Sequence, residues 1–121
     1  MRKLVALFLV CFPLQAFAEV LHYTKCSTND GKTIADVETW MKDWRALAKK
    51  KGIQYHVRIL VPHADPQMKA NDFFIESGSA TLESYAKAWQ WWYTDAEALA
   101  SNKQLMAAST CDSGAVYRST D

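Results

Sequence analysis

Several stretches of the chain alternate apolar and polar residues, a pattern typical of β-strands that are covered on one side. The alternation is clearest from Ile53 to Val61, where every second residue is apolar or aromatic. Three further stretches rich in β-forming residues predict strands at Val20–Cys26, Asp72–Ser77 and Ala115–Ser119. The pattern therefore predicts four strands.

Two other stretches carry apolar residues at three- and four-residue steps, which places them on one face of an α-helix. The first stripe runs from Ile34 to Ala48 and is followed by three lysines and Gly52, a typical helix end. The second helix is predicted to open after Gly78 and to continue without a break to Leu99. Its stripe consists of Leu82, Tyr85, Ala86, Trp89, Trp92, Tyr93, Ala96 and Leu99.

The element order is β-α-β-β-α-β, which predicts an α+β domain of the ferredoxin-like type, with a four-stranded antiparallel sheet and two helices on one face. In this topology the last strand lies antiparallel beside the first. Cys26 ends the first predicted strand and Cys111 precedes the last, so the fold brings the two residues together. We expect a disulfide between them; the alternative is a pair of free thiols.

The first eighteen residues have the three-part pattern of an export signal. Arg2 and Lys3 are followed by an apolar run at 4–14, too short to cross a bilayer, and then by small residues at Ala16 and Ala18. We expect residues 1–18 to be removed and residues 19–121 to form one exported domain, periplasmic or secreted, with no membrane segment. The alternative is a membrane anchor or a buried first helix. An oxidising compartment and two remaining cysteines favour the disulfide.

Composition excludes some function classes. The chain has 121 residues, 50% of them hydrophobic and 22% charged, which suits a single globular domain. A formal net charge of +1 argues against nucleic-acid binding driven by bulk electrostatics. Nucleophile-elbow, phosphate-loop and His-Glu-x-x-His motifs are absent from the sequence. No motif identifies a reaction, and we expect no cofactor.

The segment 73–77 running into 79–85, the long aromatic helix after it and the Cys-plus-Gly-Lys-Thr opening at 26–33 resemble the dimeric α/β-barrel superfamily, including small secreted bacterial proteins of unassigned function. The resemblance implies a homodimer in which two sheets pair face to face. It also implies kinship with cofactor-independent monooxygenases, polyketide-type cyclases and haem-degrading enzymes. The second helix contains no histidine, so the haem-degrading pattern is not matched.

Strand parity predicts that His22, His56 and Glu76 share the sheet face that points away from the helices, together with Thr24, Arg58 and Phe74. Two histidines and a carboxylate form a ligand set used by iron and zinc, but the outer two of three adjacent strands lie about 10 Å apart. A polar barrel interior or a dimer interface explains the same residues without a metal. A third interpretation makes His56 a general base oriented by Glu76, with Arg58 holding an anionic substrate.

Large rings are predicted to meet between the sheet and the helices, where they either fill the core or line an apolar ligand cavity. These candidates are Tyr23, Tyr55, Trp44, Trp89 and Tyr93. Trp91 lies off the main stripe and is expected to be exposed, on a surface for a partner or a ligand.

Two function hypotheses follow. The first is an exported, dimeric, non-enzymatic module that binds a small apolar or aromatic ligand or a partner protein. The second is a cofactor-independent monooxygenase- or cyclase-like enzyme of the barrel type that acts on an aromatic or polyketide-like compound through His56, Glu76 and Arg58.

Overall fold

The computed structural model describes residues 19–119, so the predicted export signal at 1–18 lies outside the described residues. Five strands and three helices follow one another in this part of the chain. They are β1 (Val20–Thr28), α1 (Ile34–Lys50), β2 (His56–Leu60), β3 (Asp72–Ser79), α2 (Leu82–Thr94), α3 (Ala96–Ala108), β4 (Ser109–Cys111) and β5 (Ala115–Arg118). Within residues 19–119, no helix has the length and apolar character needed to cross a membrane.

The strands form one antiparallel sheet in the order β2-β3-β1-β4, with β5 also paired to β1. The last predicted strand is present as β5, and β4 is an additional short strand before it; both pair with the same edge of β1. β4 pairs with the end of β1 and β5 with its beginning. Three residues, 112–114, separate them.

The predicted disulfide is confirmed. Cys26 in β1 lies directly opposite Cys111 in β4, and the two residues are bonded with their Cα atoms 4.0 Å apart. The bond joins residues 85 positions apart along the chain. Closing a loop of that length stabilises a fold by about 4–5 kcal/mol on the chain-entropy model.

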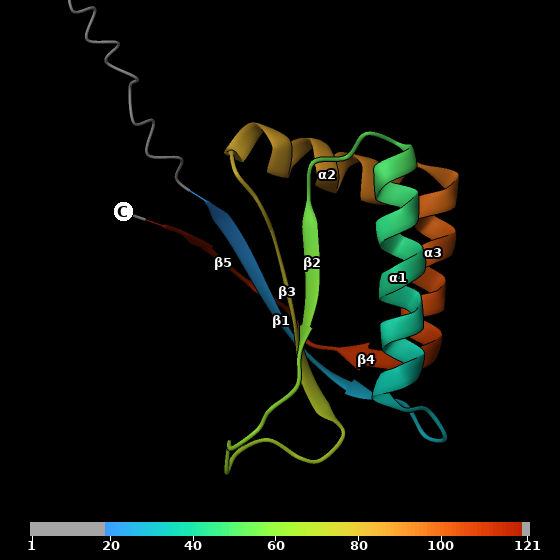
Figure 1. Cartoon of the computed structure of the whole chain (residues 1–121), viewed down its shortest axis with the longest axis vertical. Coiled ribbons are helices and arrows are strands. Elements are labelled where there is room, and N and C mark those ends of the chain that lie inside the picture. The colour runs from blue at the N-terminus through green and yellow to red at the C-terminus, as the bar shows by residue number, and fades with distance from the viewer. Residues whose placement is uncertain (1–18, 120–121) are drawn as a thin grey trace, which may run out of the picture.

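All three helices lie on one side of the twisted sheet, as Figure 1 shows: α1 and α3 run side by side, and α2 lies across one end of the strands. The Trp40 indole N–H joins α1 to α3 by donating to the backbone oxygen and the hydroxyl of Ser101, at 3.0 and 3.1 Å. Arg45 joins α1 to the sheet by donating to the backbone oxygen of Val57. These bonds fix the helical layer over the inner face of the sheet.

The predicted ferredoxin-like α+β fold is confirmed, with three differences in its elements. The second helix is broken at Asp95, which ends α2 and caps α3. The second strand is shorter than predicted, because only His56–Leu60 pairs with β3. An additional short strand, β4, precedes the last one.

Candidate functional site

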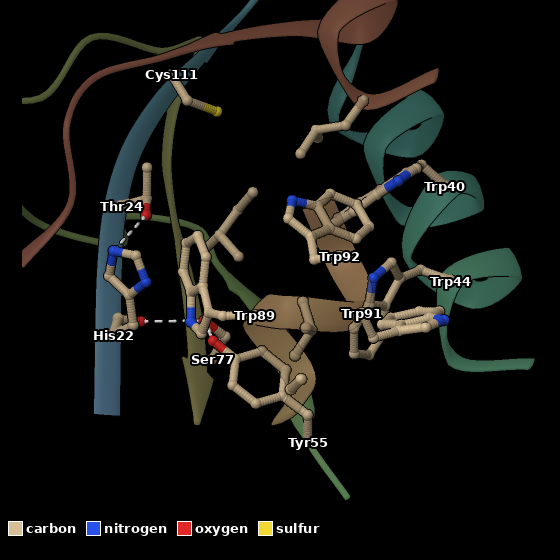
Figure 2. A pocket seen from close by; sticks show the side chains of 14 residues that line it. His22, Thr24, Trp40, Trp44, Tyr55, Ser77, Trp89, Trp91, Trp92 and Cys111 are labelled. Atoms are coloured by element: carbon tan, nitrogen blue, oxygen red, sulfur yellow. Dashed lines mark hydrogen bonds between the residues drawn. The ribbon is translucent and has the colours of Figure 1, made fainter. Parts of the chain in front are cut away.

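A cavity of about 140 Å³ lies between the sheet and the helices, and all five tryptophans of the chain line it (Figure 2). We call it the tryptophan cavity. Trp40 and Trp44 come from α1, whereas Trp89, Trp91 and Trp92 come from α2. The other lining residues are His22, Thr24, Tyr55, Val57, Ile75, Ser77, Ala88, Leu105 and Cys111.

The indole rings make a continuous aromatic wall. The ring centroid of Trp44 lies 6.0 Å from that of Trp91 and 6.4 Å from that of Trp92, in edge-to-face orientation. Tyr55 lies 6.0 Å from Trp44 on the other side. Ring pairs at such spacings stabilise by about 0.5–1.5 kcal/mol beyond the area they bury, so the wall is well defined.

His22 is the ionisable group of the inner sheet face, and it lies against this wall. It is 9% exposed, and its ring centroid lies 5.0 Å from that of Trp89. Burial lowers the pKa of His22, so the imidazole is neutral at neutral pH. Its Nε2 lies 3.5 Å from the Thr24 hydroxyl, which Figure 2 marks as a hydrogen bond.

Gly114, between β4 and β5, packs closely against the His22 side chain. A Cβ atom at this position would lie 2.0 Å from His22 Nε2 and 2.7 Å from the Thr24 hydroxyl oxygen. No side chain fits in that space, so the backbone of residue 114 itself holds the imidazole in place.

Two further hydroxyl groups pair with each other at the cavity. The Tyr55 phenol and the Ser77 hydroxyl lie 2.8 Å apart, and the Ser77 hydroxyl also donates to the backbone oxygen of His22 at 3.5 Å. Burial raises the pKa of Tyr55, partly offset by its hydrogen bond with Ser77. The phenol therefore stays protonated at neutral pH.

Two indole N–H groups are left without such a partner. The Nε1 atoms of Trp89 and Trp91 are buried, and neither makes a hydrogen bond of good geometry with any described residue. The Trp89 N–H is near enough to the Tyr55 and Tyr85 phenols to lower their pKa values slightly, against the larger effect of burial.

The outer face of the sheet carries a separate, charged cluster around Glu76. This carboxylate is 4% exposed and accepts hydrogen bonds from the Arg58 guanidinium and, at 2.7 Å, from the Tyr23 phenol. The Arg58 bond is the main reason that the pKa of Glu76 is lowered. His56 Nε2 lies 3.9 Å from Glu76, and His56 Nδ1 lies 3.9 Å from Glu19.

Beside this cluster, the outer face is apolar. Tyr23, Leu60, Phe74 and Tyr117 line a shallow hollow there, and we call these four residues the outer-face patch. Leu60 is 36% exposed and Tyr117 is 56% exposed. The described helices all lie on the opposite side of the sheet (Figure 1).

The predicted grouping of His22, His56 and Glu76 is wrong, because β1 has the opposite parity to the one predicted. Tyr23, not His22, pairs across the sheet with Glu76, so His22 and Thr24 face the helices and Tyr23 faces outward. His56, Arg58 and Glu76 do share the outer face, as predicted. Among residues 19–119, no group of three histidine, cysteine or acidic side chains is arranged to hold a metal ion.

Of the five predicted cavity residues, Trp44, Tyr55 and Trp89 lie at the tryptophan cavity. The prediction for Tyr23 is wrong, because it belongs to the outer-face patch. Tyr93 contacts Trp89 but is 61% exposed and does not line the cavity. The expectation that Trp91 is exposed is also wrong, since the residue is partly buried and lines the cavity.

Sequence reasoning missed His22, Ser77 and Gly114 as parts of the inner site. One signal was available in β1: Cys26 had to face inward to be buried, and residues at even spacing from it share its face. That places His22 and Thr24 inward. For Gly114 the sequence carries no such signal, because a glycine beside Ser113 is equally typical of a solvent-exposed turn.

No protein-family model matches the chain, and no curated protein matches its sequence. Solved structures do match. SnoaB, a cofactor-independent oxygenase from Streptomyces nogalater, has a TM-score of 0.57 at 13% identity, covering 86% of this chain and 95% of that one. An uncharacterized NIPSNAP-like domain protein from Burkholderia xenovorans has a TM-score of 0.58 at 8% identity, covering 87% and 86%.

A third structure, of an Arabidopsis thaliana protein, has a TM-score of 0.59 at 14% identity and covers 84% of this chain and 94% of that one. These likenesses span nearly the whole described domain, and at such low identity they show the fold alone. The chain has the ferredoxin-like α+β fold.

Proposed function

We propose that the protein is an exported binding module that holds a small aromatic or apolar molecule in the tryptophan cavity. The observation that carries the proposal is the gathering of all five tryptophans, from two helices, around one cavity. Rings needed only to fill a core would pack without leaving such a space, since protein interiors are close-packed. An apolar cavity of this size also loses packing contacts while it is empty, which a ligand restores.

Titration of the purified domain with small aromatic probes, followed by tryptophan fluorescence, tests this proposal. Ala88 is 4% exposed and lines the cavity, so Ala88→Leu fills part of the space. We expect it to weaken binding at least about ten-fold. Ala86→Leu adds the same side chain on the exposed side of α2 and serves as the matched control. Equal affinities in the two variants, with near-UV circular dichroism unchanged, would show that ligands do not occupy this cavity.

Export is part of the proposal. The three-part pattern of residues 1–18 supports it, and so does the disulfide, which persists in oxidising compartments. Intact-mass spectrometry of protein recovered from the periplasm or the medium should give a chain that begins at Glu19. Recovery of the full-length chain from the cytoplasm alone would contradict export.

We further propose that two copies pair through the outer sheet face to form a homodimer. The outer-face patch supports this pairing, because it exposes Leu60 and Tyr117 on a sheet surface that the described helices leave open. Light scattering coupled to size exclusion measures the oligomeric state directly.

The alternative function is a cofactor-independent enzyme that acts on an aromatic compound. Its specific support is His22, a neutral imidazole that lies in the cavity wall beside Trp89 and is able to accept a proton from a bound substrate. The earlier candidates His56, Glu76 and Arg58 lie on the other face of the sheet, too far from the cavity to take part. If His22→Gln abolishes the turnover of an aromatic probe and His56→Gln leaves it intact, this alternative is favoured over simple binding.

A further inference from the structure

We propose that the ligand of the tryptophan cavity is an aromatic carboxylate, which places its ring among the indoles and its anionic group at the open side of the cavity, against Arg118. This inference rests on the proposed binding function and specifies the class of ligand. Three observations lead to it: the position of the opening, the sheet face on which Arg118 lies, and the charges around both.

The cavity opens beside β4 and β5. Of the fourteen residues that line it, Cys111 in β4 is exposed and the others are buried or half-buried. The inner face of β5 is also uncovered: Val116 pairs with His22 and so points to the same side of the sheet, yet it is 54% exposed. Figure 1 shows β5 on the side of the sheet away from α1 and α3. The helical layer therefore ends before β5 and leaves the cavity open there.

Arg118 lies on this uncovered inner face. It pairs with Val20 in β1, two positions beyond Val116 along β5. Because the ring of the intervening Tyr117 contacts Tyr23 on the outer face, the side chain of Arg118 projects from the inner one. Two residues span about 7 Å of a strand, which is about the length of an extended arginine side chain. The guanidinium is thus able to reach a group at the opening.

The wall of the cavity suits a ring and does not suit a charge. None of the lining residues is acidic, lysine or arginine, and burial lowers the pKa of His22, so its imidazole is neutral at neutral pH. A carboxylate among them would lose its hydration and gain no partner charge. At the opening it keeps its contact with water and meets Arg118, whose planar guanidinium matches a carboxylate.

The charges of this sheet edge leave Arg118 available. Among residues 19–119, no acidic side chain forms an ion pair with it. Glu19 lies at the same end of β1, but its carboxylate is beside His56 on the outer face. Asp112 follows β4, at the opposite end of this edge. An anionic ligand therefore meets an attractive charge at the Arg118 end of the opening.

Two probes of the same shape test the inference. 3-Phenylpropionate and 3-phenylpropionamide differ in the charge at one end of the molecule. We expect the wild type to bind the carboxylate about three- to five-fold more tightly than the amide, which is the range of an exposed ion pair. High salt should remove most of this preference, because it screens exposed charges. Both probes should shift the indole N–H resonances, which locates the ring in the cavity.

Variants of exposed cations identify the group responsible. Arg118→Gln should abolish the preference and leave the affinity for the amide unchanged, whereas Arg118→Lys should keep part of it. Lys32→Gln removes one positive charge from an exposed loop beyond the other end of β1, so it is the matched control and should keep the wild-type ratio. Both positions are exposed, so the fold should persist, and circular dichroism checks this.

The possible failures are distinguishable. Equal or tighter binding of the amide, a preference that survives Arg118→Gln, or an equal loss of preference in Lys32→Gln overturns the carboxylate inference. The binding function still stands in these cases, provided that the indole resonances shift. If neither probe binds the folded wild-type domain, the proposed function itself is wrong.

Discussion

The close packing of Gly114 against His22 can be tested by adding a single methyl group at position 114. In Gly114→Ala the new Cβ would overlap the imidazole and the Thr24 hydroxyl, so one of the three must move. Overpacking of this kind costs about 1–3 kcal/mol, and we expect urea unfolding to show a loss in that range together with weaker probe binding. Ser113→Ala, one residue earlier and exposed, is the control. A Gly114→Ala variant as stable as the Ser113→Ala variant would contradict the packing described.

The buried imidazole of His22 also predicts a dependence of stability on pH. Its pKa in the folded state is lowered by burial, whereas in the unfolded chain it is about 6.5. Above that value both states are neutral. As the pH falls through it, the unfolded state takes up the proton first, so the free energy of unfolding decreases.

Urea titrations at pH 7.5 and pH 5.5 measure this effect. We expect the free energy of unfolding to fall more from pH 7.5 to pH 5.5 in the wild type than in His22→Gln. Glu76 and Asp72 have lowered pKa values and respond in a more acidic range, so they do not mask the difference. His63→Gln, at an exposed loop position, should behave as the wild type. Parallel losses in the wild type and in His22→Gln would show that His22 is not the responsible group.

At the scale of single residues, the sequence predicted correctly which face of the sheet the side chains of β2 and β3 take. For β1 it predicted the wrong face. In β3, Phe73 and Ile75 are apolar and Glu76 has the opposite parity, so the inner face is evident. In β1 both parities mix apolar and polar residues, and the large ring of Tyr23 suggested the wrong one. Tyr23 faces outward because its hydroxyl donates to Glu76, a long-range contact that no local pattern reveals.

Among the elements, the break between α2 and α3 depends on Asp95. Its carboxylate accepts hydrogen bonds from the backbone N–H groups of Glu97 and Ala98, and it forms a 3.0 Å ion pair with Lys51 at the end of α1. N-cap bonds of this type stabilise the first turn of a helix. The break lets α3 turn away from α2 and run beside α1 (Figure 1). From there α3 contributes Leu105 to the cavity wall.

We expect Asp95→Ala to lower the thermal unfolding temperature by several degrees, because two backbone donors lose their acceptor. Asp95→Asn keeps the cap and removes only the charge, so it should lose little. Differential scanning calorimetry of the two variants separates these effects. An equal loss in both would assign the stabilisation to the ion pair with Lys51 instead of the cap.

The apolar stripe alone did not predict this break, because its three- and four-residue steps continue from Leu82 across Asp95 to Leu99. Periodicity indicates which positions are buried. It does not reveal a change in helix direction when the same spacing continues after the break. The Asp95 cap was readable as a helix-start signal, but a charged residue in mid-helix is equally compatible with one long helix. The sequence also did not predict β4, because three residues are too few to show alternation.

For the whole molecule, the two sheet faces differ in character, one lined by the tryptophan cavity and the other by the outer-face patch, and the sequence predicted the fold much better than these two surfaces. The element order and the two cysteines determined the topology, because few arrangements place Cys26 beside Cys111. The cavity depends on how five indole rings pack, and packing is a property of three-dimensional shape. The role proposed for the outer face involves a second copy, about which the sequence of a single chain carries no pattern.

The outer-face patch gives the last prediction. If two copies pair through it, Leu60→Asp places an unpaired charge in the interface and should convert the dimer to a monomer at micromolar concentrations. The fold should persist, because Leu60 is already 36% exposed in one copy. Leu82→Asp, at a 69% exposed position at the start of α2, carries the same change on the helical side and should remain dimeric. Light scattering after size exclusion gives the mass of each. A wild type that is monomeric at these concentrations excludes the pairing, and a Leu60→Asp variant that stays dimeric places the interface elsewhere.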